Sequence, residues 1–264
     1  MAYLSSLREW LGRAAAHGRC ITPSLLAMHL PAPCCLCGVR TRRARLCADC
    51  RKCLADSMAG TTTRCARCGL GLAQGAACPD CSVREPAFDR VIAALDYVSP
   101  ADMLVRRFKS ADGVTYAPVL AALLAQAVRA QPSLAANTIL VPVPASRSAL
   151  ARRGFNPAAE LARYLSPLLG LPRRPGLVIR TGEGMRQASL PRCARMRNTT
   201  GLYRCIDRLD GRHIAVVDDV LTTGSTLHSI CAELKAWGAA STCGLVLART
   251  PYSNGTQHVS HHSG

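Results

Sequence analysis

The chain has 264 residues, of which 49% are hydrophobic, so it is long enough and apolar enough to bury a core, which argues against an intrinsically disordered protein. Its 33 Lys and Arg residues outnumber 16 Asp and Glu residues, giving a formal net charge of +17. This surplus favours polyanionic partners, either nucleic acid or phosphorylated small molecules.

Residues 1–30 are predicted to form one or two helices, because Leu4, Leu7 and Leu11 recur at helical spacing. Charged residues interrupt this segment, so it lacks the unbroken apolar core of a signal peptide. No other stretch has about 18 apolar residues, and no transmembrane segment is expected. We therefore expect a cytoplasmic protein, in which a count of fifteen cysteines points to metal binding rather than to disulfides.

A cysteine repeat characterises residues 31–85. Each half has the pattern C-x2-C-x9-C-x2-C, and the second half lies 31 residues after the first. Two residues between cysteines allow both sulfurs of one turn to reach one ion, and a second such turn completes a tetrahedral site. The repeat therefore predicts a double zinc ribbon with two structural zinc ions. Pairing within each half is preferred, and interleaved pairing is the alternative. The predicted ligands are Cys34, Cys37, Cys47, Cys50, Cys65, Cys68, Cys78 and Cys81.

Residues 88–250 alternate between apolar strands and amphipathic helices. Strands are predicted at 90–97, 138–144, 176–180, 213–219 and 241–249, and helices at 100–110, 118–130, 155–169 and 229–239. Such alternation predicts an α/β domain with a mainly parallel sheet and helices on both faces. Residues 251–264 carry no core-forming pattern and are predicted to be a disordered tail.

The segment HIAVVDDVLTTGSTL (213–227) places Asp218 and Asp219 at the end of a strand, directly before a loop of hydroxyls and glycine. A Walker-B-like Mg²⁺ site would require a G-x-x-x-x-G-K-[ST] loop, and a dinucleotide site would require G-x-G-x-x-G; the sequence contains neither. A phosphate cradle at a helix N-terminus remains, with carboxylates that can accept hydrogen bonds from sugar hydroxyls. A ribose 5-phosphate meets both demands.

VVDDVLTTGST resembles the 5-phosphoribosyl-1-pyrophosphate (PRPP) signature of type I phosphoribosyltransferases. Further motifs narrow the resemblance: VPVP at 141–144, RGFN at 153–156 and Q-x-x-L-x-x-x-x-R-x-x-N at 187–198, all behind the paired cysteine knuckles. Together they are similar to the ComF family, which includes proteins linked to DNA uptake and use. The resemblance covers about residues 31–250 and implies a type I phosphoribosyltransferase fold.

The resemblance implies that the protein binds PRPP with Mg²⁺ and displaces pyrophosphate from C1 of the ribose through an oxocarbenium-like state. Asp218 and Asp219 are the implied catalytic residues, because they would bind the ribose hydroxyls and assist Mg²⁺. The implied ligand-binding residues are Thr222, Thr223, Gly224, Ser225 and Thr226 for the 5-phosphate, and Arg152, Arg153, Gly154 and Lys109 for the pyrophosphate. Lys109 is equally consistent with a surface lysine that ends a helix.

The basic segment 181–200 lies where these enzymes carry a flexible hood that closes over the reacting centre. Arg186, Gln187 and Arg195 are its candidate ligand contacts, and a solvated loop is the alternative. Thr222 stands where purine-salvage enzymes carry an aspartate that contacts the base. The resemblance therefore disfavours hypoxanthine or guanine salvage and leaves the acceptor unknown.

Two functions are weighed on this basis. The first is a PRPP-binding phosphoribosyltransferase or a sensor that only binds PRPP. The second is a nucleic-acid-associated protein of DNA uptake in which basic residues of the ribbons contact DNA, with a pure protein-docking ribbon as a third possibility. Aromatic residues, at 4%, offer few stacking surfaces for single strands. The basic ribbon residues are Arg40, Arg42, Arg43, Arg45, Arg51, Lys52, Arg64 and Arg67.

Overall fold

The computed structural model of the chain describes residues 32–41, 45–59, 63–182 and 201–252. The predicted helices within 1–30, the tail from residue 253 and the hood candidates Arg186, Gln187 and Arg195 lie outside the described residues. The chain divides into two compact units, Met1–Arg51 and Lys52–Gly264. The first four cysteines of the repeat thus belong to one unit and the last four to the other.

The first unit contains one short antiparallel pair, β1 (Ala32–Pro33) with β2 (Arg40–Thr41), and the start of helix α3 (Ala48–Ala59). Between β1 and β2 the chain forms a tight knuckle. The Gly38 N–H donates to the Cys34 carbonyl at 2.9 Å, and Gly38 adopts a φ of +78°. Glycine has no Cβ and adopts this left-handed conformation at little cost, which explains why it follows Cys37.

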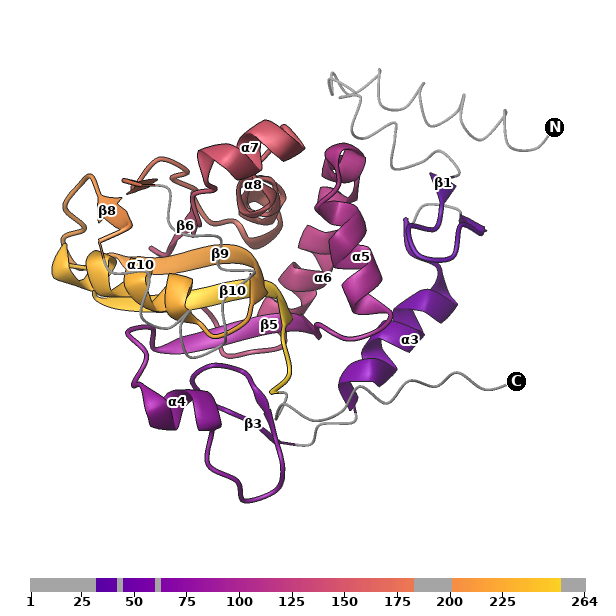
Figure 1. The fold of residues 1–264 in the computed structure, drawn as a ribbon, viewed down its shortest axis with the longest axis horizontal. Helices are drawn as coiled ribbons and strands as arrows, with labels where there is room; N and C mark the ends of the chain where they lie inside the picture. Colours follow the sequence, from indigo (N-terminus) through magenta and orange to yellow (C-terminus); the bar gives the residue numbers. More distant parts are fainter. Residues whose placement is uncertain (1–31, 42–44, 60–62, 183–200, 253–264) are drawn as a thin grey trace. The chain divides into compact units, whose positions relative to one another are not determined.

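The second unit contains the remaining elements (Figure 1). In chain order they are β3 (Thr63–Arg64), β4 (Gly71–Leu72), α4 (Pro79–Val83), β5 (Arg90–Asp96), α5 (Ala101–Phe108), the 3₁₀ helix η1 (Ala111–Tyr116), α6 (Ala117–Arg129), β6 (Ile139–Pro142), α7 (Arg147–Arg153), α8 (Pro157–Leu169), β7 (Val178–Arg180), β8 (Tyr203–Cys205), β9 (His213–Leu221), α10 (Ser225–Ala236) and β10 (Ser241–Arg249).

Within the described residues, four parallel strands form the central sheet in the order β5-β10-β9-β6. Parallel pairing brings the carboxyl ends of all four strands to one edge. At this edge Arg249 of β10 pairs with Asp96 of β5 on one side and with Leu221 of β9 on the other. Ligands of open α/β sheets bind outside this edge, so the fold directs attention to the residues that follow β5, β6 and β9.

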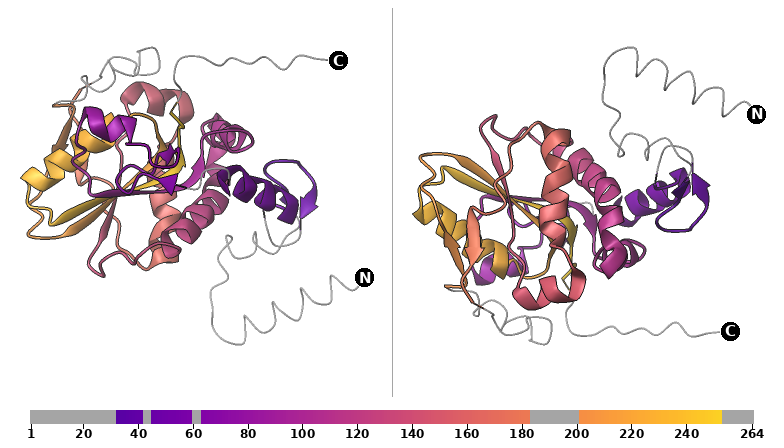
Figure 2. Two further views of the ribbon diagram at one scale, coloured as in Figure 1. Left: turned by 90° about the horizontal axis from the view of Figure 1, so that it is seen from below. Right: turned by 90° about the horizontal axis from the view of Figure 1, so that it is seen from above.

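Helices cover both faces of the sheet, as the sequence predicted (Figures 1 and 2). Helices α6 and α8 pack on each other, α6 against β5 and β10 and α8 against β6 and β9, while α10 packs against β9 and β10. Val216 and Val246 share one buried cluster with Leu227 of α10. Because side chains alternate along a strand, the neighbouring buried residues Ala215 and Leu245 lie on the opposite face.

The strand predicted at 176–180 is present as β7, but it lies outside the central sheet and pairs antiparallel with β8, a strand that the sequence did not predict. The segment after VPVP, where the sequence predicted no helix, forms helix α7 over Arg147–Arg153. Its signals were present in the sequence: the Ser146 hydroxyl accepts from the Ala149 N–H at 3.2 Å, and Gly154 ends the helix with a φ of +78°.

Among the described residues, one helical stretch, Ala111–Arg129, is long and apolar enough to cross a membrane by length and composition. The sequence predicted no such segment. In the structure its α6 part packs against α8 and the sheet, with Leu120 and Leu124 fully buried. The apolar character of this stretch is therefore explained by its place in the core of the second unit.

Gly113 is closely packed against the end of helix α5. A Cβ at this position would lie 2.0 Å from the Phe108 carbonyl oxygen, so the backbone must shift to accept a side chain. We expect Gly113→Ala to lower the free energy of unfolding by about 3 kcal/mol, the upper range for overpacking. Denaturant titration would measure the loss. Gly176→Ala is the matched control, because its Cβ would meet nothing within 4 Å; equal stability of the two variants would contradict the prediction.

Candidate functional site

The described residues bring the eight repeat cysteines together as two groups of four. Within each group all four Sγ atoms lie within 4.8 Å of one another. Cys37 Sγ lies 3.7 Å from Cys47 Sγ, and Cys68 Sγ lies 3.5 Å from Cys78 Sγ. A tetrahedral zinc ion with Zn–S bonds of about 2.3 Å holds sulfurs about 3.8 Å apart, so both groups fit this ion. The knuckles pair within each half of the repeat, which is the preferred arrangement; the interleaved one does not occur in either group.

The second group is part of a hydrophobic core. Cys68 is 3% exposed, and it belongs to the same buried cluster as Leu70, Phe88 and Val91. In the first group, by contrast, Cys37 is exposed. The second group therefore supports packing in the unit that holds the sheet, in addition to closing its own knuckles.

The two predicted acids lie at the carboxyl end of β9. Lys109, which caps the C-terminus of α5, places its Nζ atom 3.0 Å from Asp219 Oδ1. Asp218 Oδ1 accepts a hydrogen bond from the Asp219 N–H at 2.8 Å. The structure thus brings Lys109 to Asp219 from a position 110 residues earlier in the chain. Lys109 both ends helix α5 and contacts one of the acids, and its contact with pyrophosphate stays a prediction.

The environment of Asp218 disfavours its charged form. Burial, followed by the neighbouring Asp219 carboxylate, raises the pKa of Asp218 to about 7, although the Asp219 N–H and Lys109 act in the opposite direction. A bound cation or a set of sugar hydroxyls would offset this cost by stabilising the carboxylate. Positive charge or hydrogen-bond donors near Asp218 would therefore favour its charged form.

The loop after β9 leads directly into α10, whose N-cap is Gly224 with a φ of +78°. A Cβ at Gly224 would meet the Phe88 ring at 3.6 Å, so the loop backbone lies close to the end of the cysteine-rich segment. Thr223 Oγ1 lies 3.0 Å from Ser225 Oγ, and the same Thr223 oxygen accepts a hydrogen bond from the Ser225 N–H at 3.4 Å. The first amides of a helix lack partners within the helix, so this loop presents donors suited to an anion. Thr222 and Thr226, on either side, are half-buried.

Arg152, Arg153 and Gly154, the predicted pyrophosphate contacts, lie at the end of α7. Arg152 is exposed and Arg153 half-buried, and the Gly154 N–H donates to the Leu150 carbonyl at 2.8 Å. Most of helix α7 therefore lies between the end of β6 and these two arginines. Their contact with pyrophosphate stays a prediction.

The next two residues of the RGFN motif have structural roles. The Phe155 ring packs against Phe108 with centroids 6.0 Å apart, next to Lys109. Asn156 caps α8 by accepting from the Ala158 N–H at 3.1 Å, and it donates to the Val143 carbonyl at 2.9 Å. The motif thus fastens α5, the end of β6 and α8 around the carboxyl edge of the sheet.

Tyr203 was not identified from the sequence. It lies on β8, beyond the segment 183–200, and its hydroxyl is 3.5 Å from Arg180 Nη1. Burial raises the pKa of Tyr203, while Arg180 and a hydrogen bond with the Thr226 side chain lower it. Tyr203 therefore connects the β7–β8 pair with the last residue of the loop 222–226. A short strand with one aromatic residue gives no sequence signal for this contact.

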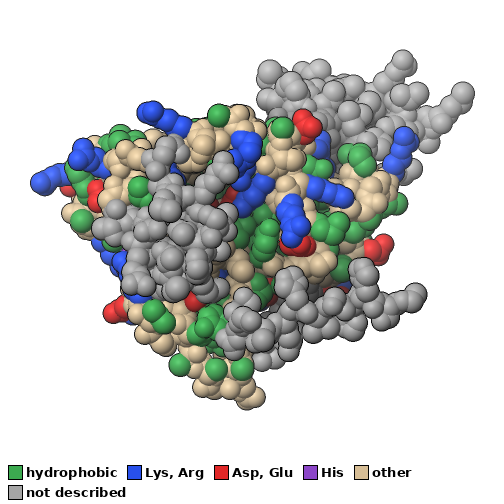
Figure 3. All heavy atoms as spheres, in the orientation of Figure 1, with side chains coloured by type: hydrophobic (Ala, Val, Ile, Leu, Met, Phe, Trp, Pro, Cys, Tyr) green, Lys and Arg blue, Asp and Glu red, His purple; other side chains and the backbone are tan. Residues whose placement is uncertain are grey.

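Several basic ribbon residues pair with acids of the same chain. Arg64 donates to both carboxylate oxygens of Asp96, at 3.0 and 2.7 Å, and Arg67 contacts Glu85 at 2.6 Å. Lys52 pairs with Asp56 at 2.8 Å. On the face drawn in Figure 3, Lys and Arg side chains are spread among acidic and apolar ones. Arg42 and Arg43 lie outside the described residues.

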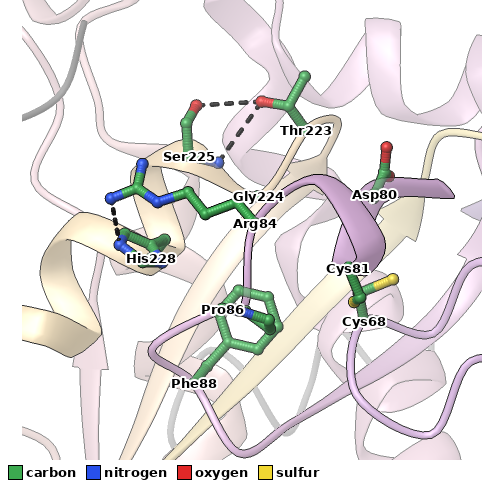
Figure 4. A pocket seen from close by; sticks show the side chains of 10 residues that line it. All are labelled: Cys68, Asp80, Cys81, Arg84, Pro86, Phe88, Thr223, Gly224, Ser225 and His228. Atoms are coloured by element: carbon green, nitrogen blue, oxygen red, sulfur yellow. Dashed lines mark hydrogen bonds between the residues drawn. The ribbon is translucent and has the colours of Figure 1, made fainter. Parts of the chain in front are cut away.

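A pocket lies between the second cysteine group and the loop 222–226 (Figure 4). Burial and the neighbouring Arg84 lower the pKa of His228, so its ring is neutral near pH 7, and its Nδ1 accepts from the Ala87 N–H at 3.0 Å. Asp218 and Asp219 are not among the residues that line this pocket. The lining residues are Cys68, Asp80, Cys81, Arg84, Pro86, Phe88, Thr223, Gly224, Ser225 and His228.

Comparison with solved structures finds loose similarity to phosphoribosyltransferases. A purine phosphoribosyltransferase from Pyrococcus horikoshii is 22% identical, with a TM-score of 0.31, over 55% of this chain and 79% of that chain. A hypoxanthine-guanine phosphoribosyltransferase from L. donovani is 21% identical, with a TM-score of 0.30, over 52% and 72%. No family model matches the chain.

Curated relatives are considerably more similar in sequence. Competence protein F of Haemophilus influenzae is 31% identical over 210 residues, which are 74% of this chain and 90% of that protein. The DNA utilization protein YhgH of Salmonella typhimurium is 33% identical over 220 residues, 78% of this chain and 97% of that protein. Since identity above 30% extends over nearly the whole length of these relatives, the chain belongs to the ComF family, to which its paired knuckles and its VVDDVLTTGST loop had pointed.

Proposed function

We propose that the second unit binds PRPP with Mg²⁺ at the carboxyl edge of its sheet and acts as a phosphoribosyltransferase-like protein in the cytoplasm. One observation carries the proposal: the Lys109 Nζ atom lies 3.0 Å from Asp219 Oδ1, directly before a loop whose amides begin α10. The Lys109 ammonium thus lies beside the carboxylates at the end of β9, and the anion-binding terminus of α10 follows these carboxylates after a short loop. PRPP carries matching groups, namely a pyrophosphate, ribose hydroxyls and a 5-phosphate.

In this proposal each part of the site has a distinct task. The acids Asp218 and Asp219 accept hydrogen bonds from the ribose hydroxyls and would help to hold Mg²⁺, which neutralises charge on the leaving pyrophosphate. The loop Thr222–Thr226 binds the 5-phosphate, and Lys109 moves from Asp219 to a pyrophosphate oxygen. Thr222 offers no carboxylate to a purine base, which disfavours hypoxanthine or guanine as the acceptor and leaves the acceptor open. Each cysteine group holds one structural zinc ion.

Isothermal titration of the metal-loaded chain with PRPP tests the proposal. We expect saturable 1:1 binding in the presence of Mg²⁺, because both the pyrophosphate and the ribosyl phosphate are engaged. Ribose 5-phosphate and pyrophosphate, titrated separately as controls, should each bind at least tenfold more weakly, since each engages half of the site. Binding by pyrophosphate alone as strong as binding by PRPP would contradict the proposal.

A role in the use of DNA is the second candidate, and the names of the relatives, competence protein F and DNA utilization protein, favour it. The net charge of +17 supports an association with polyanions. However, Arg64 donates to both carboxylate oxygens of the buried Asp96, so this ribbon residue is poorly available for phosphates. We propose that the protein serves the same process as its relatives through its ribosyl-phosphate site and not mainly through a DNA-binding ribbon.

A further inference from the structure

Arg249, at the end of β10, is the largest fully buried side chain of the described residues and is 1% exposed. A guanidinium cannot be deprotonated in a protein, and a buried one requires hydrogen-bond acceptors for its five N–H groups and a compensating charge. The partners that Arg249 has are therefore informative. They belong to two different parts of the candidate site.

One part is the second cysteine group. Arg249 Nε donates to the Cys68 carbonyl at 3.1 Å, and Nη2 lies 3.8 Å from Cys68 Sγ. Nη2 also donates to Asp80 Oδ2. Asp80 lies on α4 between two other cysteines of the group, Cys78 and Cys81, and is 9% exposed. The guanidinium thus contacts both knuckles of this group and finds its counter-charge there.

The other part is the loop after β9. Arg249 Nη1 donates to the Leu221 carbonyl at 3.2 Å, to the Thr222 carbonyl and to the Thr250 carbonyl at 2.9 Å. Leu221 is the last residue of β9, and Thr222 is the first residue of the proposed phosphate loop. Figure 4 shows that the following residues of this loop line the same pocket as Cys68, Asp80 and Cys81.

We propose that Arg249 is a positioning residue that couples metal binding at the second cysteine group to ligand binding by the loop 222–226. The metal fixes Cys68 and α4, these fix the guanidinium, and the guanidinium fixes the backbone of Leu221 and Thr222. When the metal leaves, α4 is a five-residue helix without its cross-link, and the loop loses its support. The inference rests on the proposed function, because it names what controls that site.

Coupling between two binding sites is reciprocal in free energy, so the ligand must also tighten the binding of the metal, and we expect the tighter binding to appear as slower metal release. The test loads the full chain with zinc and follows zinc release to a chromogenic chelator, with and without PRPP and Mg²⁺. We expect PRPP to slow the release of one of the two zinc ions by about tenfold, within the usual range of coupling between sites. The first cysteine group is the internal control, because PRPP that merely chelates zinc would affect both ions. A Cys37→Ala/Cys50→Ala variant, which retains only the second group, identifies the slowed ion.

Arg249→Lys tests the residue itself. Lysine keeps a positive charge for Asp80, but one ammonium cannot reach Cys68, Leu221 and Thr222 together. The variant should still bind two zinc ions and bind PRPP up to tenfold more weakly, and PRPP should no longer slow zinc release. Should this variant fail to fold, Asp80→Asn, which retains an oxygen acceptor for Arg249, is expected to reduce the coupling as well.

The outcomes separate the two proposals. If the metal-loaded wild type does not bind PRPP, the proposed function fails and the coupling fails with it. If PRPP binds but both zinc ions leave at unchanged rates, the coupling alone is overturned. The coupling alone is also overturned if Arg249→Lys and Asp80→Asn both retain the full effect of PRPP on zinc release.

Discussion

Asp218→Asn is expected to weaken PRPP binding roughly 30-fold, because about 2 kcal/mol of charge-assisted hydrogen bonding to the ribose is lost. Asparagine has the same size as aspartate and leaves the 3.0 Å contact between Lys109 and Asp219 in place. Titration calorimetry with PRPP and Mg²⁺ measures the loss. Unchanged affinity would remove Asp218 from the ligand site.

The same substitution is expected to stabilise the fold at high pH. Burial and Asp219 raise the pKa of Asp218 from 3.8 to about 7, so the native state holds a proton that the unfolded state releases. The wild type therefore loses stability as the pH rises from about 4 to about 7, and the asparagine variant lacks this loss. We expect the variant to be more stable by about 4 kcal/mol at pH 8 and equal at pH 4, in buffer without Mg²⁺.

Asp207→Asn provides the control for both measurements. Asp207 forms an exposed ion pair with Arg174 at 3.0 Å, and such surface pairs contribute little to stability. Its replacement should change neither PRPP affinity nor the pH profile of unfolding. A wild-type profile without any decline between pH 4 and pH 7 would show that Asp218 is not held in a costly environment.

Cys68→Ala is expected to lower the melting temperature of the second unit by about 10 °C, corresponding to about 4 kcal/mol. Cys68 is a predicted zinc ligand, a member of a hydrophobic cluster and a partner of the buried Arg249. Replacing Cys68 would remove the metal, and the ion pair of Arg249 and Asp80 would lose the Cys68 side chain beside it. Calorimetry with metal analysis measures both effects.

Cys37→Ala is the matched control for this prediction. It removes one sulfur from the first group, which belongs to the other compact unit, and Cys37 is exposed. We expect it to lose one zinc ion per chain while the sheet-containing unit melts at an unchanged temperature. Equal destabilisation by the two variants would contradict the different roles that we infer for the two groups.

The sequence predicted the parts of the site that depend on local order along the chain. The cysteine spacing and the acid–loop motif place their residues within short segments, so Cys65 with Cys68 and Asp218 with the loop could be identified without a fold. Lys109 was named as a candidate through a family resemblance, but its contact with Asp219 became visible only in the structure.

The contacts of Arg249 and Tyr203 could not be predicted in this way. Arg249 and Cys68 are separated by 181 residues, and the sequence around Arg249 reads as the end of an ordinary buried strand. Tyr203 reaches Thr226 only because β8 pairs with β7 instead of joining the central sheet. Such contacts depend on the order of strands and on which elements pack side by side, and neither is encoded in a local pattern.

The strand order also sets the sequence of events when the protein is made. Strand β10 lies between β5 and β9, although it follows both in the chain, so β5 has no place in the sheet until β10 has been synthesised. A nascent chain that stops before Ser241 would expose the paired edges of β5 and β9 and would lack the guanidinium of Arg249. The second cysteine group and the loop 222–226 leave the ribosome earlier, and they become parts of one site only with the last strand.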